Sequence, residues 1–233
     1  MRTRTAFLTT LLAATTAQGH DLWLDRIGNG YELLYGHRHS GHSGQDTIEY
    51  QPSAVQRLVC FDTGGKAVGQ GATARYPARL AGDCAVSYAL LSSGYWTKTP
   101  YGTKNVPKDE VDAAVSSWLS FEGVKRIDHW GQALARPLTQ DLELVPLDDL
   151  LALGDGDKLR LQATFRGQPV AGAVVAYDGK PRGQTGPDGW INVKVRHGGL
   201  QVVEATLRRP LDGLKADEEV HTSTLSFTLG GQP

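Results

Sequence analysis

Four of the seven histidines lie close together near the start of the chain, at His20, His37, His39 and His42. Imidazole is the commonest protein ligand for zinc, copper and nickel, so this cluster predicts a transition-metal site. The competing interpretation is a solvated polar loop that binds nothing. That interpretation is strongest for His42, which lies in a glycine-rich loop of uncertain direction.

The residues around these histidines predict a β-hairpin. Residues 20–26 alternate between polar and apolar types, as a half-buried strand does. Gly28, Asn29 and Gly30 follow as turn residues, and residues 31–39 have the composition of a return strand. The hairpin would bring the histidines at its two ends together.

The length of the turn decides which histidines face each other. A two-residue turn at Gly28-Asn29 would place His20 opposite His37, and a turn one residue later would place it opposite His39. Directly opposed residues have Cβ atoms about 5 Å apart, close enough for one ion to bridge their rings. A three-residue loop would break this arrangement, so the predicted site depends on an even turn.

Other side chains of the hairpin are less favoured as metal ligands. Tyr35 shares the predicted face with the histidines and could lie axial to an ion, although packing against Leu22 and Leu33 is the favoured interpretation. Asp21 and Asp25 lie on the opposite face of an ideal strand. We therefore expect both aspartates at the solvent, or outside the set of direct ligands.

The segment before the hairpin has the pattern of a cleavable signal peptide, residues 1–19. Arg2 and Arg4 form a short positive region, and an apolar, small-residue stretch too short to span a membrane follows. Ala17 and Gly19 then supply small residues before a cleavage site. The alternative, a buried N-terminal helix, lacks an amphipathic period. The pattern predicts export to the periplasm.

Cleavage would change the chemistry of the first histidine. Cleavage after Gly19 would free the α-amino group of His20, which could chelate one ion together with its own Nδ1 atom. Cleavage after Ala17 would leave a histidine at position three, a terminus that can wrap Cu(II) or Ni(II) in square-planar nitrogens. Cleavage at either position would therefore produce a metal-chelating N-terminus, with a different coordination geometry in each case.

The remaining composition excludes several functions. The formal net charge is −1 and no basic stripe is visible, so nucleic acid is an unfavoured partner. There is no phosphate-binding loop, dinucleotide fingerprint or nucleophile elbow. Glu143, Asp148 and Asp149 lie together in a connector, where a solvated turn explains them. We therefore predict that the protein is not an enzyme. The isolated histidines are expected to be structural or exposed; they are His129, His197 and His221.

The two cysteines, Cys60 and Cys84, lie in strand-like segments. In an oxidising compartment a structural disulfide is the favoured interpretation. A thiolate metal ligand and two free buried thiols remain the alternatives.

The fold class predicted from the whole chain is mainly β, with two β-sandwich-like (Ig-like or Greek-key) domains and one helix in or after the first. The 28 glycines and the single methionine favour short strands and turns. Residues 107–127 are the expected helix, because apolar residues recur there at helical spacing. We place the domains at 20–149, which holds the metal site, and 150–233. The expected strands are 55–62, 66–76, 84–98, 142–146, 158–165, 173–177, 190–195, 201–207 and 219–229.

Several motifs resemble the NikM-like periplasmic proteins, a family tied to nickel and cobalt uptake. The resemblance covers nearly all of the chain after the signal peptide. It rests most on two motifs, residues 20–24 (HDLWL) and 35–37 (YGH). The supporting motifs are residues 60–66 (CFDTGGK), 93–96 (SGYW), 118–127, 142–147 (LELVPL), 167–173 (GQPVAGA) and 185–189 (TGPDG).

The resemblance implies a periplasmic Ni(II)- or Co(II)-binding accessory of a membrane metal transporter, of ABC or ECF type or an outer-membrane receptor system. It carries over His20 and His37 as ligands, while His39 and His42 have no clear counterpart. Two alternatives stay open for copper: a Cu(II)-handling protein, and a copper enzyme with an N-terminal histidine brace. A structural β-sandwich with an incidental histidine loop is the fourth hypothesis.

Overall fold

The computed structural model describes residues 21–38 and 46–230, and within them the chain is almost entirely strands and loops. Strands make up 56% of the described residues, and helical turns make up 6%. The prediction of a mainly β, sandwich-like fold is confirmed. The helical turns of the described residues are single 3₁₀ turns at Pro52–Ala54, Lys108–Glu110, Gln132–Leu134 and Leu150–Ala152.

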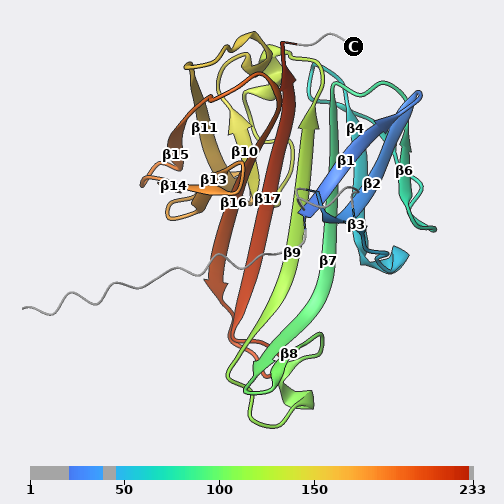
Figure 1. Cartoon of the computed structure of the whole chain (residues 1–233), viewed down its shortest axis with the longest axis vertical. Coiled ribbons are helices and arrows are strands. Elements are labelled where there is room, and N and C mark those ends of the chain that lie inside the picture. The colour runs from blue at the N-terminus through green and yellow to red at the C-terminus, as the bar shows by residue number, and fades with distance from the viewer. Residues whose placement is uncertain (1–20, 39–45, 231–233) are drawn as a thin grey trace, which may run out of the picture.

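A nine-stranded sheet forms the centre of the molecule (Figure 1). Its strands are β4 (Val55–Phe61), β5 (Ala67–Gln70), β7 (Val86–Thr99), β8 (Gly102–Lys104), β9 (Ser116–Ile127), β13 (Val174–Tyr177), β14 (Lys180–Gln184), β16 (Gly199–Pro210) and β17 (Glu218–Leu229). The order is β14-β13-β16-β17-β9-β7-β4-β5, with β8 paired to β7. The β17–β9 pair is parallel and the other pairs are antiparallel.

Two four-stranded sheets cover opposite faces of this central sheet. The hairpin sheet consists of β1 (Asp21–Ile27), β2 (Gly30–His37), β3 (Asp46–Thr47) and β6 (Ala78–Ala81). The second sheet consists of β10 (Glu143–Pro146), β11 (Lys158–Phe165), β12 (Gln168–Pro169) and β15 (Trp190–Lys194).

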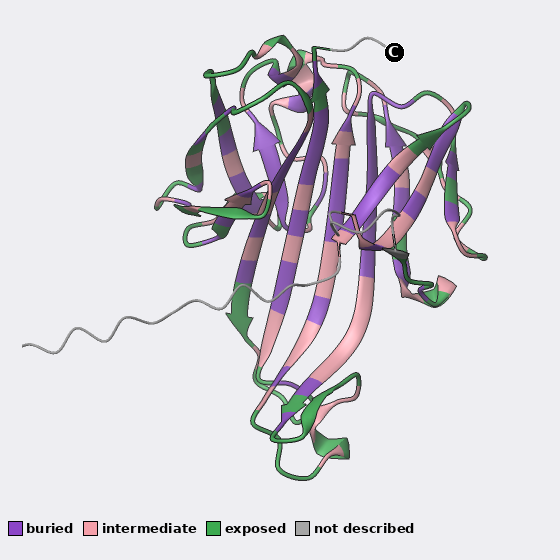
Figure 2. Ribbon diagram, in the orientation of Figure 1, coloured by how far each residue is buried: buried purple, intermediate pink, exposed green. Residues whose placement is uncertain are grey.

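Each covering sheet buries its own hydrophobic core. Along β7, Tyr88 and Leu90 pack with the second sheet, whereas Ala89 and Leu91 pack with the hairpin sheet. Successive strand residues point to opposite faces, so this alternation shows that the central sheet is buried on both sides. The far halves of the long strands β7, β9, β16 and β17 extend past both covering sheets, and Figure 2 shows them mostly half-buried there.

The predicted helix at residues 107–127 is wrong. Residues 108–110 form one 3₁₀ turn, and Ser116–Ile127 is strand β9, which pairs with β7 on one side and β17 on the other. Apolar residues stand on both faces of β9 because both faces are covered, so the polar–apolar alternation of a half-buried strand is blurred. Apolar spacing in such a strand resembles helical spacing by chance.

The boundary predicted near residue 150 falls in the 3₁₀ turn at Leu150–Ala152, and Leu150 is fully buried in the core beneath the second sheet. The strands on either side of that point join in one sheet, because β9 and β17 pair along ten residues, from Glu218↔Trp118 to Phe227↔Ile127.

The connector contains a buried ion pair where the sequence favoured a solvated turn. Lys125 Nζ on β9 lies 2.7 Å from Glu143 Oε1, and the two side chains are 1% and 0% exposed. The second carboxylate oxygen of Glu143 accepts hydrogen bonds from the backbone N–H groups of Leu138 and Thr139 and from the Thr139 hydroxyl. The solvated-turn prediction is therefore wrong for Glu143.

The cysteines form a disulfide, which confirms the favoured prediction. The Cys60–Cys84 bond has an S–S distance of 2.06 Å and joins β4 to the loop before β7. Within the described residues, no helix is long and apolar enough to cross a membrane.

Candidate metal centre

The hairpin has a two-residue turn. Its pairs run from Asp21↔Gly36 to Ile27↔Gly30, which leaves Gly28 and Asn29 as the turn, with Gly28 at φ 51°. This is the first of the two registers considered from the sequence, and it meets the condition of an even turn. Glycine suits the position because a left-handed φ has no steric cost for it.

Of the four candidate histidines, His37 is the one that the structure describes. It ends β2, pairs with Asp46 of β3 and is half-buried. His20, His39 and His42 lie outside the described residues. Within the described part of the chain, no three His, Cys, Asp or Glu side chains form a group that could hold a metal ion.

The hairpin rests on the central sheet through its apolar inner face. Leu22, Leu24 and Leu33 are almost fully buried there, and Tyr35, opposite Leu22, packs against the same core. The packing interpretation of Tyr35 agrees with this placement. Burial raises the pKa of Tyr35, and the carboxylates of Glu122 and Asp21 raise it further. The Tyr35 hydroxyl is therefore protonated at neutral pH and lies near both acidic groups.

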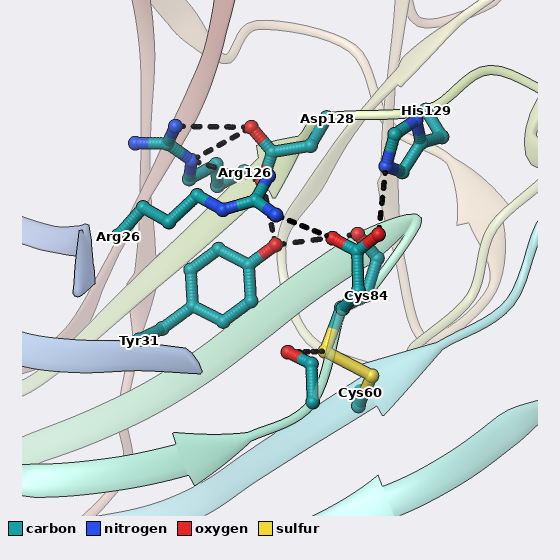
Figure 3. Close-up of a disulfide and its surroundings, with 9 residues drawn as sticks. Arg26, Tyr31, Cys60, Cys84, Arg126, Asp128 and His129 are labelled. Atoms are coloured by element: carbon teal, nitrogen blue, oxygen red, sulfur yellow. Dashed lines mark hydrogen bonds and ion pairs between the residues drawn. A yellow bond between two sulfur atoms is a disulfide. The ribbon is translucent and has the colours of Figure 1, made fainter. Parts of the chain in front are cut away.

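Polar contacts fix the hairpin near the disulfide (Figure 3). The Tyr31 hydroxyl lies 2.8 Å from Asp128 Oδ2 and 3.3 Å from the carbonyl oxygen of Cys84. Arg126 pairs with Asp128, and its Nη1 donates to the carbonyl oxygen of Leu24 in β1 at 3.2 Å. These contacts position β1 along β9.

A carboxylate on β9 faces the hairpin sheet. Glu122 pairs with Leu91 of β7 and lies two residues before Val124; both neighbours belong to the core under the hairpin, so all three share a face. The pKa of Glu122 is raised to about 7, mainly by burial and in smaller part by the Asp21 carboxylate. Hydrogen bonds from the Ser93 and Ser120 hydroxyls act in the opposite direction.

The sequence did not indicate Glu122 as a candidate, because residues 107–127 were expected to form a helix. In a strand, alternate residues share one face, so Ser120, Glu122 and Val124 point the same way. If residues 116–127 are assigned as a strand, the sequence separates this set from Phe121 and Lys125 on the other face. The alternation along that strand is therefore the sequence feature that indicates where Glu122 points.

The other face of the hairpin, which carries Trp23, also holds a basic side chain. The backbone N–H of Arg38 donates to Asp21 Oδ2 at 3.2 Å, and its guanidinium lies 3.6 Å from Asp25 Oδ1. The same guanidinium lies 5.8 Å from the centre of the Trp23 ring. Asp21 and Asp25, predicted to lie at the solvent or outside the ligand set, therefore both contact Arg38.

A cavity of about 50 Å³ separates this corner of the hairpin from β16 and β17. Its polar walls include Asp21, Arg38, Glu204 and Thr224. Trp23 also lines it, and the indole N–H of Trp23 is buried with no acceptor among the described residues. A space of this size and polarity suits a few water molecules.

The remaining histidines each have their own neighbours. His129 Nε2 lies 3.4 Å from Asp83 Oδ2 at the surface, and His197 Nε2 lies 2.8 Å from Asp178 Oδ2. The His221 ring stacks on Phe121. These placements agree with the structural or exposed roles expected from the sequence.

A family model described as "Domain of unknown function (DUF4198)" matches residues 17–209. No curated protein and no solved structure matches the chain.

Proposed function

The chain belongs to the DUF4198 family, and we propose that this member binds a transition-metal ion, Ni(II) or Co(II), in the periplasm and assists its uptake through a membrane transporter. His20 and His37 are the principal ligands, with a third imidazole from His39 or His42. The transporter is of ABC or ECF type or belongs to an outer-membrane receptor system.

The register of the hairpin carries the proposal. The pairing Asp21↔Gly36 ends the described ladder at the residue after His20 and the residue before His37. An even turn was the condition under which those two histidines share a face. The half-buried position of His37 at the end of β2 adds support, because a ligand there is partly shielded from water.

The proposed identity of the metal and the proposed location of the protein rest on the sequence. The signal-peptide pattern supports export, and the resemblance to the NikM-like proteins supports nickel or cobalt over copper. Copper usually wins on raw affinity, so a preference for nickel would come from geometry and availability in the periplasm.

Metal analysis of the exported protein tests the proposal. Protein purified from the periplasm without an N-terminal tag should contain about one Ni(II) or Co(II) ion after dialysis. Its intact mass should equal that of a chain that begins at His20 or Gln18. His37→Ala should lose the ion, whereas His129→Ala, which changes an exposed histidine elsewhere, should keep it. Untagged wild-type protein that retains no divalent ion after dialysis would refute the proposal.

A further inference from the structure

We infer that the cavity between the hairpin and strands β16 and β17 binds a small zwitterion, a molecule of the size of glycine that carries one carboxylate and one ammonium group. The inference is separate from the proposed metal site, because the residues that carry it lie in the described part of the chain and need no metal ion. The cavity has a volume of about 50 Å³, and its walls come from two different sheets.

A buried hydrogen-bond donor lines the cavity on the hairpin side. Trp23 of β1 is 1% exposed, and its indole N–H is buried without an acceptor among the described residues. An indole N–H can only donate, and burial of an unpaired donor is unfavourable. Because Trp23 lines the cavity, a molecule bound there can supply the missing acceptor.

Arg38, directly after β2, adds a positive charge beside this donor. Its guanidinium lies 5.8 Å from the centre of the Trp23 ring, and its side chain is 11% exposed. The carboxylate with which it pairs, that of Asp25, is 3.6 Å away, which is farther than a hydrogen bond. A guanidinium group binds a carboxylate through two parallel hydrogen bonds. Arg38 and the Trp23 N–H together therefore suit a carboxylate.

Acidic side chains line the same cavity. They are Glu204 of β16, in the central sheet, and Asp21 at the start of β1. The pKa of Glu204 is raised, mainly by burial and in smaller part by the carboxylates of Asp21 and Asp178. Among the described residues, the charged groups that act on Glu204 are thus acidic. An ammonium group in the cavity would offset this repulsion and stabilise the Glu204 carboxylate.

The charges and the size of the cavity together favour a zwitterion over a simple ion. A free anion would bind Arg38 but would be repelled by Glu204 and Asp21. A free cation would be repelled by Arg38 and would leave the Trp23 N–H without an acceptor. About 10–15 Å³ of such volume holds one water molecule, so the cavity has room for about four positions of that size. Glycine fits this space, whereas an amino acid with a large side chain does not.

Titration of the untagged, full exported chain with three ligands in metal-free buffer tests the inference. Glycine itself chelates Ni(II) and Co(II), so the absence of metal separates this site from the proposed metal site. Glycine should bind and move the assigned indole N–H resonance of Trp23 downfield in ¹⁵N–¹H spectra, because a carboxylate then accepts from that group. Acetate and methylammonium, which each carry one of the two charges, should bind at least tenfold more weakly.

Two matched carboxylate variants test the acidic side of the cavity. Glu204→Gln should lower the affinity for glycine at least tenfold without weakening that for acetate, because it removes the partner of the ammonium group alone. Glu218→Gln is the control, since Glu218 lies on β17 but pairs with Arg208 and does not line the cavity. It should change the affinity for either ligand less than threefold.

The outcomes that overturn the inference are distinct. If glycine leaves the Trp23 resonance unmoved, the cavity holds water alone. If acetate binds as tightly as glycine, or if Glu204→Gln binds glycine like the wild type, the site does not recognise a zwitterion. Should Glu204→Gln not fold, the three ligands on wild-type protein still decide. No arm depends on metal content, so failure of the proposed function and failure of this inference are distinguishable.

Discussion

Tyr31 on the hairpin and Asp128 at the end of β9 are joined by a 2.8 Å hydrogen bond between the phenol and Oδ2. Tyr31 is 1% exposed, so this contact is shielded from water. It links the first hairpin of the chain to the strand that carries Glu122, and it stands beside the disulfide (Figure 3).

Tyr31→Phe should lower the free energy of unfolding by about 1–2 kcal/mol, because the Asp128 carboxylate and the Cys84 carbonyl oxygen both lose a donor. Urea unfolding measures the change. Tyr101→Phe, at a 94% exposed position, should be neutral. Equal stability of the two variants would show that the phenol contributes nothing to hairpin anchoring.

Lys125→Met should cost about 3–5 kcal/mol, because it leaves the Glu143 carboxylate buried without its cation. Arg160→Met, which breaks the exposed pair with Asp148, should cost much less, because water screens an exposed ion pair. Urea midpoints of both variants provide the comparison. A loss for Lys125→Met no greater than that for Arg160→Met would contradict the assignment of a buried pair.

Replacing both cysteines by alanine should lower stability by about 3 kcal/mol, because the unfolded chain regains the entropy of the closed loop. Thermal unfolding of the variant and the oxidised wild type measures this difference. Reduced wild-type protein should behave like the variant. If reduction leaves the unfolding temperature unchanged, the bond does not constrain the fold.

Stability should fall as pH drops below about 6.5, with His221 as one cause. Burial against Phe121 and Phe165 lowers the pKa of His221, although Glu219 opposes this shift. The unfolded chain therefore binds a proton at a pH where the folded protein still excludes it, so acid favours unfolding. The stabilisation is complete above pH 6.5 and declines below it.

His221→Phe, which keeps an aromatic ring against Phe121, should remove this contribution. The loss of stability between pH 8 and pH 5, measured by urea unfolding, should be smaller in the variant than in the wild type. Identical losses would mean that burial of His221 does not resist protonation.

A tag left before His20 should weaken metal binding by removing the free α-amino group from the site. Affinities for Ni(II) of tagged protein and of protein with the native N-terminus, both measured by competition with a chelator of known strength, provide the test. If the two forms bind equally, the amine is not a ligand and only side chains hold the ion.

Local sequence determined much of this protein. The Gly-Asn turn determined the hairpin and its register, because two-residue turns favour such sequences and fix the pairing of the flanking strands. Turn residues at short intervals marked most of the other strands, and two cysteines in strand-like segments indicated the disulfide. These features depend on neighbours in the chain, so their signals are present in short windows.

Tertiary structure decided the rest. Ser116–Ile127 is a strand because β7 and β17 supply hydrogen-bond partners and the covering sheets bury both its faces. Lys125 finds Glu143 and Glu122 faces the hairpin only once that strand is in place. Such contacts join residues that are distant in the chain, and they decide the structure of this segment against its local preference for a helix. No short window of sequence therefore contains the information.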